Sequence, residues 1–284
     1  MADGTSLINL GELSKPVTVL IEKVSAAVGV VFEPTRIVRK ANAEAKADII
    51  KANAGVEIRD IEKRAIDRLI FQETRKQENI ESITFQAATN LSPDAKVEML
   101  DVDWVTHFFK HCDTVSDVEM QTLWARVLTG EATKSGTFSK RTVQFISTLD
   151  KSEAELFTKL CQFVWVVDEP FPYITDEESE IYLKHGINFY SLAHLKSIGL
   201  IVYEDVFIRT LSDISNNKSN SIIFKYFDKV HTVQKTENES MMIGKVLFTK
   251  LGKELLSISG ALENTHFYEH ILNEWKKNSI KHSI

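Results

Sequence analysis

The chain is short of cysteine and of residues that break helices. Its 284 residues include two cysteines, Cys112 and Cys161, which are far apart in the sequence. This is too few for a disulfide framework, so the sequence favours a reducing compartment and predicts a cytoplasmic protein. Five prolines and eleven glycines leave long stretches that can form helices. With 43% hydrophobic residues, the chain can bury a sizeable core and is not globally disordered.

Long apolar runs are also missing. The first fifteen residues lack the basic start and apolar core of a signal peptide. No run of about eighteen apolar residues predicts a helix that spans a membrane. The best candidate for a membrane contact is the amphipathic segment Val17–Phe32. Its polar side has almost no Lys or Arg, so packing on other helices is favoured, and a membrane surface stays open as the alternative.

The balance of charge argues weakly against nucleic acid. The formal net charge is −6, and residues 151–284 hold fifteen Lys or Arg against eighteen Asp or Glu, a net of −3. Phosphate neutralisation drives most nucleic-acid affinity, so an acidic C-terminal half is poor evidence for DNA binding. Local basic patches could still overcome this average.

The sequence contains no familiar catalytic motif. A phosphate-binding loop needs an upstream glycine and a Ser or Thr after its Gly-Lys pair, but Gly244-Lys245 is followed by Val246. A Gly-x-Ser-x-Gly elbow and a glycine-rich dinucleotide turn are absent. Cys112 follows His111, yet adjacency in sequence does not orient an imidazole to activate a thiolate. We therefore expect neither an enzyme nor a bound cofactor, with catalytic groups that converge from distant positions as the alternative.

Two histidine pairs have a spacing that suits a zinc ion. His107 and His111, and likewise His266 and His270, are four residues apart and share a helical face. Neither pair has the glutamate of a hydrolytic HExxH motif, and no third ligand is specified. Ordinary surface or core histidines are the favoured interpretation, and we predict no metal site.

The pattern of apolar residues predicts a mainly α-helical protein with four parts. We expect an amphipathic N-terminal helix in residues 1–34, a long helix in 35–91, a helical middle domain in 92–150 and a winged-helix-like domain in 151–284. In the middle domain, we expect a capping box at Ser116–Glu119, a helix that ends at Gly130, and a further helix over Phe138–Leu149.

The long helix is the predicted interaction surface. It has no proline from Thr35 to Asn90, and its amphipathic stripe must be buried against something. A polar stretch after the stripe interrupts any heptad seam, so a continuous coiled coil is not supported. We expect a homo-oligomer, or binding of an unidentified protein, through four residues: Ile58, Ile61, Ala65 and Leu69.

The C-terminal part predicts a winged-helix-like domain of the α+β class. A short helix ends at Gly199 in left-handed cap geometry, a strand follows at Ile201–Val202, and a return strand at Val246–Phe248 leads through Thr249 into another helix. The intervening segment is too long for a simple wing and predicts an enlarged hairpin of three or four strands. A final helix is expected over Leu262–Trp275.

This domain offers a weak nucleic-acid candidate. The residues concerned are Ser191, His194, Lys196 and Lys218. The recognition-type helix contains no arginine, whereas helices that read DNA present Arg or several polar groups to the bases. A contact with protein or a structural role is therefore favoured over DNA.

Three strings resemble the uncharacterised bacterial family catalogued as domain of unknown function 2806. They are SKPVTVLIEKVSAAVG at Ser14–Gly29, RKANAEAKAD at Arg39–Asp48, and the stretch from Glu119 to Leu160. The third string also resembles the end of the abortive-infection alpha family. The resemblance links the chain with phage resistance and transfers no catalytic residue.

These observations lead to one expected function with two alternatives. We expect a non-enzymatic interaction protein, and the resemblance implies a sensor, scaffold or effector in antiphage defence. The alternatives are a DNA-binding regulator that uses the winged helix and a membrane-perturbing effector that uses Val17–Phe32.

Overall fold

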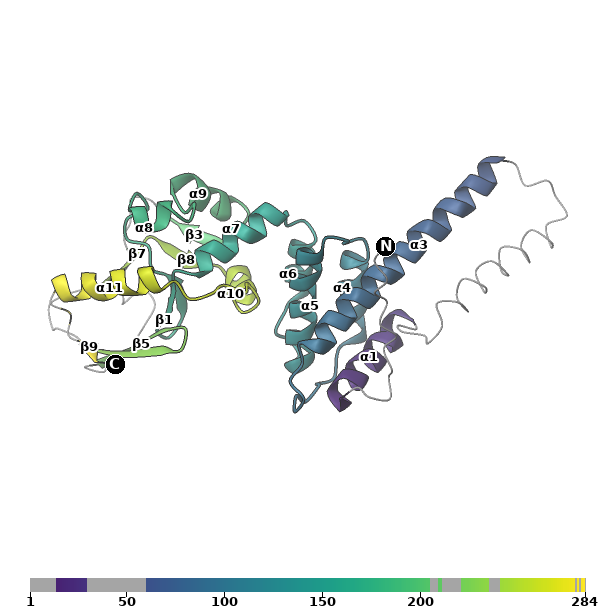
Figure 1. The fold of residues 1–284 in the computed structure, drawn as a ribbon, viewed down its shortest axis with the longest axis horizontal. Helices are drawn as coiled ribbons and strands as arrows, with labels where there is room; N and C mark the ends of the chain where they lie inside the picture. Colours follow the sequence, from purple (N-terminus) through teal and green to yellow (C-terminus); the bar gives the residue numbers. More distant parts are fainter. Residues whose placement is uncertain are drawn as a thin grey trace, which may run out of the picture. The chain divides into compact units, whose positions relative to one another are not determined.

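The computed structural model divides the chain into two compact units, residues 1–148 and 149–284, which we call unit 1 and unit 2. Figure 1 shows the fold. The structure describes residues 14–29, 60–204, 209–210, 221–234, 241–278, 280 and 282–283.

Two of the described helices of unit 1 are α1 and α3. α1 spans Lys15–Val28 and has Pro16 in its first turn, as the sequence predicts. α3 spans Asp60–Thr89 and ends where the predicted long helix was expected to end. Residues 35–59 of that predicted helix lie outside the described residues. Both helices pack on α4, and α1 also packs on α3.

The structure also describes α4 (Val102–Cys112), α5 (Val118–Thr133) and α6 (Lys140–Ile146) in unit 1. The predicted capping box at Ser116 is wrong, because Asp117 is the N-cap and its carboxylate accepts the N–H groups of Glu119 and Met120. The Ser116 hydroxyl instead accepts from Arg75.

The predicted end of α5 at Gly130 is also wrong. Gly130 lies inside the helix, and a Cβ there would come within 2.6 Å of the Phe138 ring. The glycine therefore makes room for Phe138 rather than ending the helix. The next helix is shorter than predicted because Ser139 caps it, with its hydroxyl accepting the Thr142 N–H at 3.2 Å.

The core of unit 1 contains a cluster of aromatic side chains. The rings of Phe108 and Trp124 meet edge to face with centroids 5.2 Å apart, and both side chains are fully buried. Trp104 is also buried and donates from its indole N–H to the Phe138 carbonyl at 2.8 Å. This contact ties α4 to the segment before α6.

Unit 2 opens with α7 (Lys151–Cys161), which begins with the predicted capping box of Asp150 and Glu153. Its other described helices are α8 (Glu180–Leu183), α9 (Phe189–Ser197), α10 (Lys250–Leu256) and α11 (Thr265–Lys277). α11 starts three residues later than predicted, because the Asn264 side chain caps it by accepting the Phe267 N–H at 3.0 Å.

A short antiparallel pair follows α9 as predicted. Gly199 has a φ of +84°, and β3 (Ile201–Tyr203) then pairs with β8 (Val246–Phe248). Thr249 caps α10 by accepting the Gly252 N–H at 3.1 Å. Figure 1 shows α7, α9 and this strand pair within one part of unit 2.

The prediction that the intervening strands form one enlarged hairpin with β3 and β8 is wrong. The central strands, β5 (Ser221–Tyr226) and β6 (Lys229–Gln234), do not extend β3 and β8. They join an antiparallel sheet with β1 (Val164–Val166), β2 (Pro170–Pro172) and β9 (His282–Ser283), in the order β2-β1-β5-β6-β9. A separate pair is formed by β4 (Arg209–Thr210) and β7 (Met242–Gly244).

The reason for this pairing is the inward face of the hairpin. Ile222, Phe224 and Tyr226 alternate inward along β5 and are buried. Phe224 contacts Trp275 of α11, with ring centroids 5.2 Å apart, and Tyr226 contacts Trp165 of β1 at 5.1 Å. The hairpin therefore covers an aromatic core instead of projecting as a wing.

The described structure is thus mainly helical, with small antiparallel sheets in unit 2. Among the described residues, no helix combines the length and the apolar character that crossing a membrane requires.

Candidate functional site

The N-terminal half of α3 projects beyond the helices that pack on its C-terminal half (Figure 1). Its apolar residues are exposed: Ile61 has 64% and Leu69 57% of its surface open to solvent, and Ala65 is also exposed. We call Ile61, Ala65 and Leu69 the α3 stripe. Ile58, the fourth residue of the predicted interface, lies outside the described residues.

The α3 stripe continues a face that is buried further along the same helix. Ile61, Ala65 and Leu69 each precede by eighteen residues one of three buried residues: Asn79, Ile83 and Ala87. Eighteen residues make about five complete turns, so each pair points in the same direction. The same helical face is therefore packed against α5 and α1 at one end and uncovered by them at the other.

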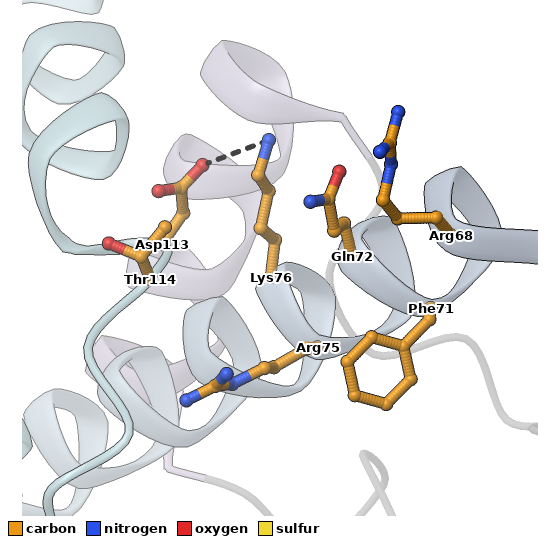
Figure 2. Close-up of a pocket in the computed structure, with 7 residues that line it drawn as sticks. All are labelled: Arg68, Phe71, Gln72, Arg75, Lys76, Asp113 and Thr114. Carbon is orange, nitrogen blue, oxygen red and sulfur yellow. Dashed lines mark ion pairs between the residues drawn. The ribbon is translucent and has the colours of Figure 1, made fainter. Parts of the chain in front are cut away.

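A pocket of about 550 Å³ lies where the covered and uncovered parts of α3 meet. Figure 2 shows its lining from the middle of α3 and from the turn that follows α4. We call it the α3 pocket. The residues that line it are Arg68, Phe71, Gln72, Arg75, Lys76, Asp113 and Thr114.

The α3 pocket carries excess positive charge. Three of its lining residues are basic and one is acidic. The Lys76 ammonium lies 3.8 Å from the Asp113 carboxylate, and it also donates to Glu73 at 3.0 Å. The hydrogen bond and charge of Glu73, with the charge of Asp113, raise the pKa of Lys76. Burial raises the pKa of Asp113 above its usual value, although Lys76 opposes this shift.

Polar contacts of the lining residues and their neighbours hold the pocket wall against α3. Arg75 donates from Nε and Nη2 to the Ser116 hydroxyl at 3.0 and 2.9 Å. The Asn79 amide donates to the Asp113 carbonyl at 2.8 Å, and the Gln121 amide donates to the Asn79 side-chain oxygen at 3.1 Å. These bonds hold the turn after α4 against α3, so the pocket wall is positioned by the fold.

The sequence analysis did not identify the pocket residues as a site. A signal was present, because Arg64, Arg68 and Arg75 fall on one side of α3 at spacings of four and seven. Asp113 and Thr114, however, join them only through the packing of α4 and α5, which no local pattern shows.

Three of the four nucleic-acid candidates, Ser191, His194 and Lys196, lie on α9. Ser191 caps α9 together with Asn188, donating to the Asn188 carbonyl at 2.9 Å. The His194 ring lies 2.8 Å from the Glu153 carboxylate, and Lys196 is exposed. Lys218 lies outside the described residues. The side chains most exposed at the start of α9 are apolar or aromatic, with Tyr190 at 81%.

The histidine pairs and the two cysteines form no metal centre among the described residues. His107 and His111 do contact each other, with ring centroids 4.5 Å apart, and burial together with the His107 charge lowers the pKa of His111. Burial raises the pKa of the Cys112 thiol well above its usual value, which argues against a thiolate nucleophile. Lys245 of the incomplete phosphate loop is used in an ion pair with Glu177 at 2.9 Å.

The candidate membrane segment has its apolar side covered. Leu20 and Val24 of α1 are fully buried, where α1 packs on α3 and α4. An insertion into a bilayer would first have to separate α1 from these helices. Residues 30–32 of the segment lie outside the described residues.

Comparison with known proteins identifies the family. The family model described as a protein of unknown function, DUF2806, matches residues 63–272. The chain belongs to the DUF2806 family. The match includes the α3 stripe from Ala65 onward and the whole α3 pocket. No curated protein and no solved structure matches this DUF2806 protein, and the comparisons lend no support to the resemblance to the abortive-infection alpha family.

Proposed function

We propose that this DUF2806 protein is a cytoplasmic, non-enzymatic interaction protein that associates with a second copy of itself through the α3 stripe. The observation that carries the proposal is the exposure of Ile61 and Leu69 on a helical face that the fold buries elsewhere. Exposed apolar stripes of this kind are typical of surfaces that bind protein.

The stripe is complementary to itself. If two α3 helices lie antiparallel about a point between Ala65 and Leu69, the small Ala65 of each copy faces the large Leu69 of the other. Antiparallel pairing also avoids a collision. A parallel partner that followed the same face would meet α5 and α1, whereas an antiparallel partner centred there places Asp60, the first described residue of its α3, opposite Thr74, before the face that α5 and α1 cover.

The mass of the protein in solution tests this proposal. We expect light scattering at micromolar concentration to give twice the chain mass of 32.3 kDa, and a single-chain mass after Ile61→Glu and Leu69→Glu together. Met99→Glu is the matched control, because Met99 is 82% exposed and lies outside α3. A single-chain mass for the unchanged protein would contradict the proposal.

The role in antiphage defence belongs to this proposal through the sequence resemblance alone. A sensor, scaffold or effector that acts as a pair should lose protection when pairing is lost. We expect phage to form fewer plaques on bacteria that carry the gene than on bacteria in which it is deleted. Bacteria that carry the Ile61→Glu and Leu69→Glu protein should allow as many plaques as the deletion strain.

DNA binding by a winged helix is the second candidate function. It is supported by the order of α7, α9, β3 and β8, by the packing of α9 on α7 and β3, and by the exposure of His194 and Lys196 on α9. Binding to duplex DNA that weakens with salt and with Lys196→Gln would favour it. If the protein does not bind duplex DNA even at low salt, DNA binding is contradicted.

A further inference from the structure

Four residues of the α3 pocket have the spacing of a hole in a helix–helix interface. They occupy positions i, i+3, i+4 and i+7 of α3: Arg68, Phe71, Gln72 and Arg75. In packed helices, four residues at this spacing surround one side chain of the facing helix. In Figure 2, Gln72 points to the same side of α3 as Arg68, whereas Phe71 points to the opposite side. The pocket therefore has the form that receives a side chain from a second helix.

The wall of this hole is mainly apolar. The Lys76 ammonium is turned toward the Asp113 carboxylate at 3.8 Å, and the Arg75 guanidinium donates to the Ser116 hydroxyl at 3.0 Å. Their methylene stems, rather than their charged ends, are therefore left to the pocket. The Phe71 side chain, which is 66% exposed, adds an aromatic ring. Such a wall suits an apolar side chain.

In the antiparallel pair proposed above, Ile61 of the second copy reaches this hole. The pair is centred at position 67, midway between Ala65 and Leu69, so Ile61 of one copy lies at the level of position 73 of the other, one residue from Gln72. At 100° per residue, Ile61 lies about 40° and Gln72 about 20° from Ala65, both toward the same side of α3. A two-fold axis between antiparallel helices places this side against the same side of the other copy. Ile61 of the second copy therefore meets Gln72.

Charge also favours this occupant. Asp60 and Glu62 flank Ile61 in the first described turn of α3, so they approach the pocket with it. The lining, with three basic residues and one acidic residue, has a net charge of +2. Glu73, at the same level of the helix, accepts a hydrogen bond from Lys76 at 3.0 Å and is compensated within its own chain. The acidic start of each α3 thus meets the basic lining of the other copy.

Phe71 gives the arginines on this side of α3 a favourable contact. Arg64 and Arg68 of both copies lie on this side, and their repulsion opposes pairing. Arg64 of the second copy lies at the level of position 70, one residue from Phe71. A guanidinium group stacks well on an exposed aromatic ring, and this contact offsets part of the repulsion.

We propose that the α3 pocket is the binding site for Ile61 of a second copy and that Phe71 contacts Arg64 of that copy. The proposal rests on the proposed function, and it adds which residues meet and in which direction the helices run. The pocket, of about 550 Å³, is larger than one isoleucine side chain, so it also admits part of the helical turn that carries Ile61. By symmetry, each pair contains two such contacts, one on each side of its centre.

Disulfide cross-linking tests the contact. We expect mild oxidation of the double variant Ile61→Cys with Gln72→Cys to join two chains of 32.3 kDa, because the two positions are one residue apart in level across the pair. Within one chain they are eleven residues, or about 17 Å, apart and cannot join. Neither single variant should cross-link, since the two copies of position 61 lie about 18 Å apart along the helices and those of position 72 about 15 Å.

Lys63→Cys with Gln72→Cys is the matched control. Lys63 is exposed on the same helix and points about 160° away from Ala65, so it should not reach the pocket of the second copy. The natural cysteines, Cys112 and Cys161, are buried and should not take part.

The dissociation constant of the pair tests the role of Phe71. Phe71→Ala should raise it by about fivefold or more, because each pair loses two ring contacts with arginine. Thr74→Ala is the control, since Thr74 is exposed on the side of α3 that faces away from the stripe. Equal dissociation constants for these two variants would overturn the contact assigned to Phe71.

The outcomes separate this proposal from the proposed function. If the protein has twice the chain mass but the double variant cross-links no better than the Lys63→Cys control, association through the α3 stripe stands and the pocket assignment is overturned. Cross-linking of Ile61→Cys alone would indicate parallel helices and would also overturn the assignment. A single-chain mass for the unchanged protein would overturn the proposed function, and the pocket assignment with it.

Discussion

At the scale of single residues, a buried polar contact lies in unit 2 around Glu177. Its carboxylate accepts from Lys245 Nζ at 2.9 and 3.1 Å and from the Tyr203 hydroxyl at 2.9 Å. Burial by itself would raise the pKa of Glu177, but these hydrogen bonds outweigh burial and hold the pKa below its usual value. The contact joins the segment before α8 to β3 and to Lys245, between β7 and β8.

The lowered pKa makes this contact depend on pH. A carboxyl group whose pKa is lower in the folded state stabilises that state above its unfolded pKa of about 4.3, and the contribution is lost as the pH falls through the folded value. We expect Glu177→Gln to reduce the free energy of unfolding at pH 7 by roughly 1.5–3 kcal/mol. The difference from the unchanged protein should shrink below about pH 4.

Urea unfolding at pH 7 and pH 3.5 measures this difference. Glu178→Gln is the control, because Glu178 is the exposed neighbour of Glu177 and its loss should have little effect at either pH. An equal loss of stability for Glu177→Gln at both pH values would show that the charge of Glu177 does not matter.

A strained turn is the second residue-scale feature. Phe227, at the tip of the β5–β6 hairpin, has a φ of +50°, which is uncommon for a bulky residue. Its ring is 42% exposed and lies edge to face against Tyr226, with centroids 5.0 Å apart. The ring contact offsets part of the backbone cost of this turn.

At the scale of secondary structure, α1 is held by its buried side. Val24 is fully buried, whereas Ala26, two residues further along the helix, is exposed. We expect Val24→Asp to lower the free energy of unfolding of unit 1 by more than about 3 kcal/mol, because it places a charge in the apolar contact with α3 and α4. Ala26→Asp should change it by less than about 0.5 kcal/mol.

Thermal unfolding of the two variants measures the difference. If Val24→Asp were as stable as Ala26→Asp, α1 would not be docked in solution, and its apolar side would be available to a membrane. This comparison therefore also tests the membrane alternative for Val17–Phe32.

Local sequence signals predicted the starts of several elements. Asp150 with Glu153, Gly199 and Thr249 act where the sequence places them, because a cap needs only its near neighbours in the chain. The helix end predicted at Gly130 was wrong because the role of this glycine depends on the Phe138 ring, which reaches it through tertiary packing.

The sequence did not predict which distant segments of the chain lie together. The alternation along β5 predicts a strand but not its partner. β1 is the partner, because Trp165 of β1 and Tyr226 of β5 are buried in the same aromatic core. The α3 pocket is similar, since Asp113 reaches α3 only through the packing of α4.

At the scale of the whole molecule, each unit contains one of the two cysteines. Cys112 lies in unit 1 and Cys161 in unit 2, and both are buried. Burial raises the pKa of Cys161 to about 12 and also raises that of Cys112. Neither thiol should react with a soluble disulfide reagent until its unit opens.

Thiol labelling can therefore follow the two units separately. We expect Cys161→Ala to leave a signal from unit 1 and Cys112→Ala a signal from unit 2, each appearing only at denaturant concentrations that unfold its unit. Thr74→Cys, at an exposed position of α3, should react at once and serves as the control. Rapid labelling of either natural cysteine in native buffer would contradict the burial described here.

The positions of the tryptophans have an optical consequence. Trp104 and Trp124 are buried in unit 1, and Trp165 and Trp275 are buried in unit 2. Intrinsic emission should therefore be blue-shifted in the native protein and move to the red as either core opens. The projecting half of α3 contains no tryptophan, so events there leave this emission unchanged. Phe71→Trp would place a fluorophore on the wall of the α3 pocket, so that changes at this position become visible in the emission.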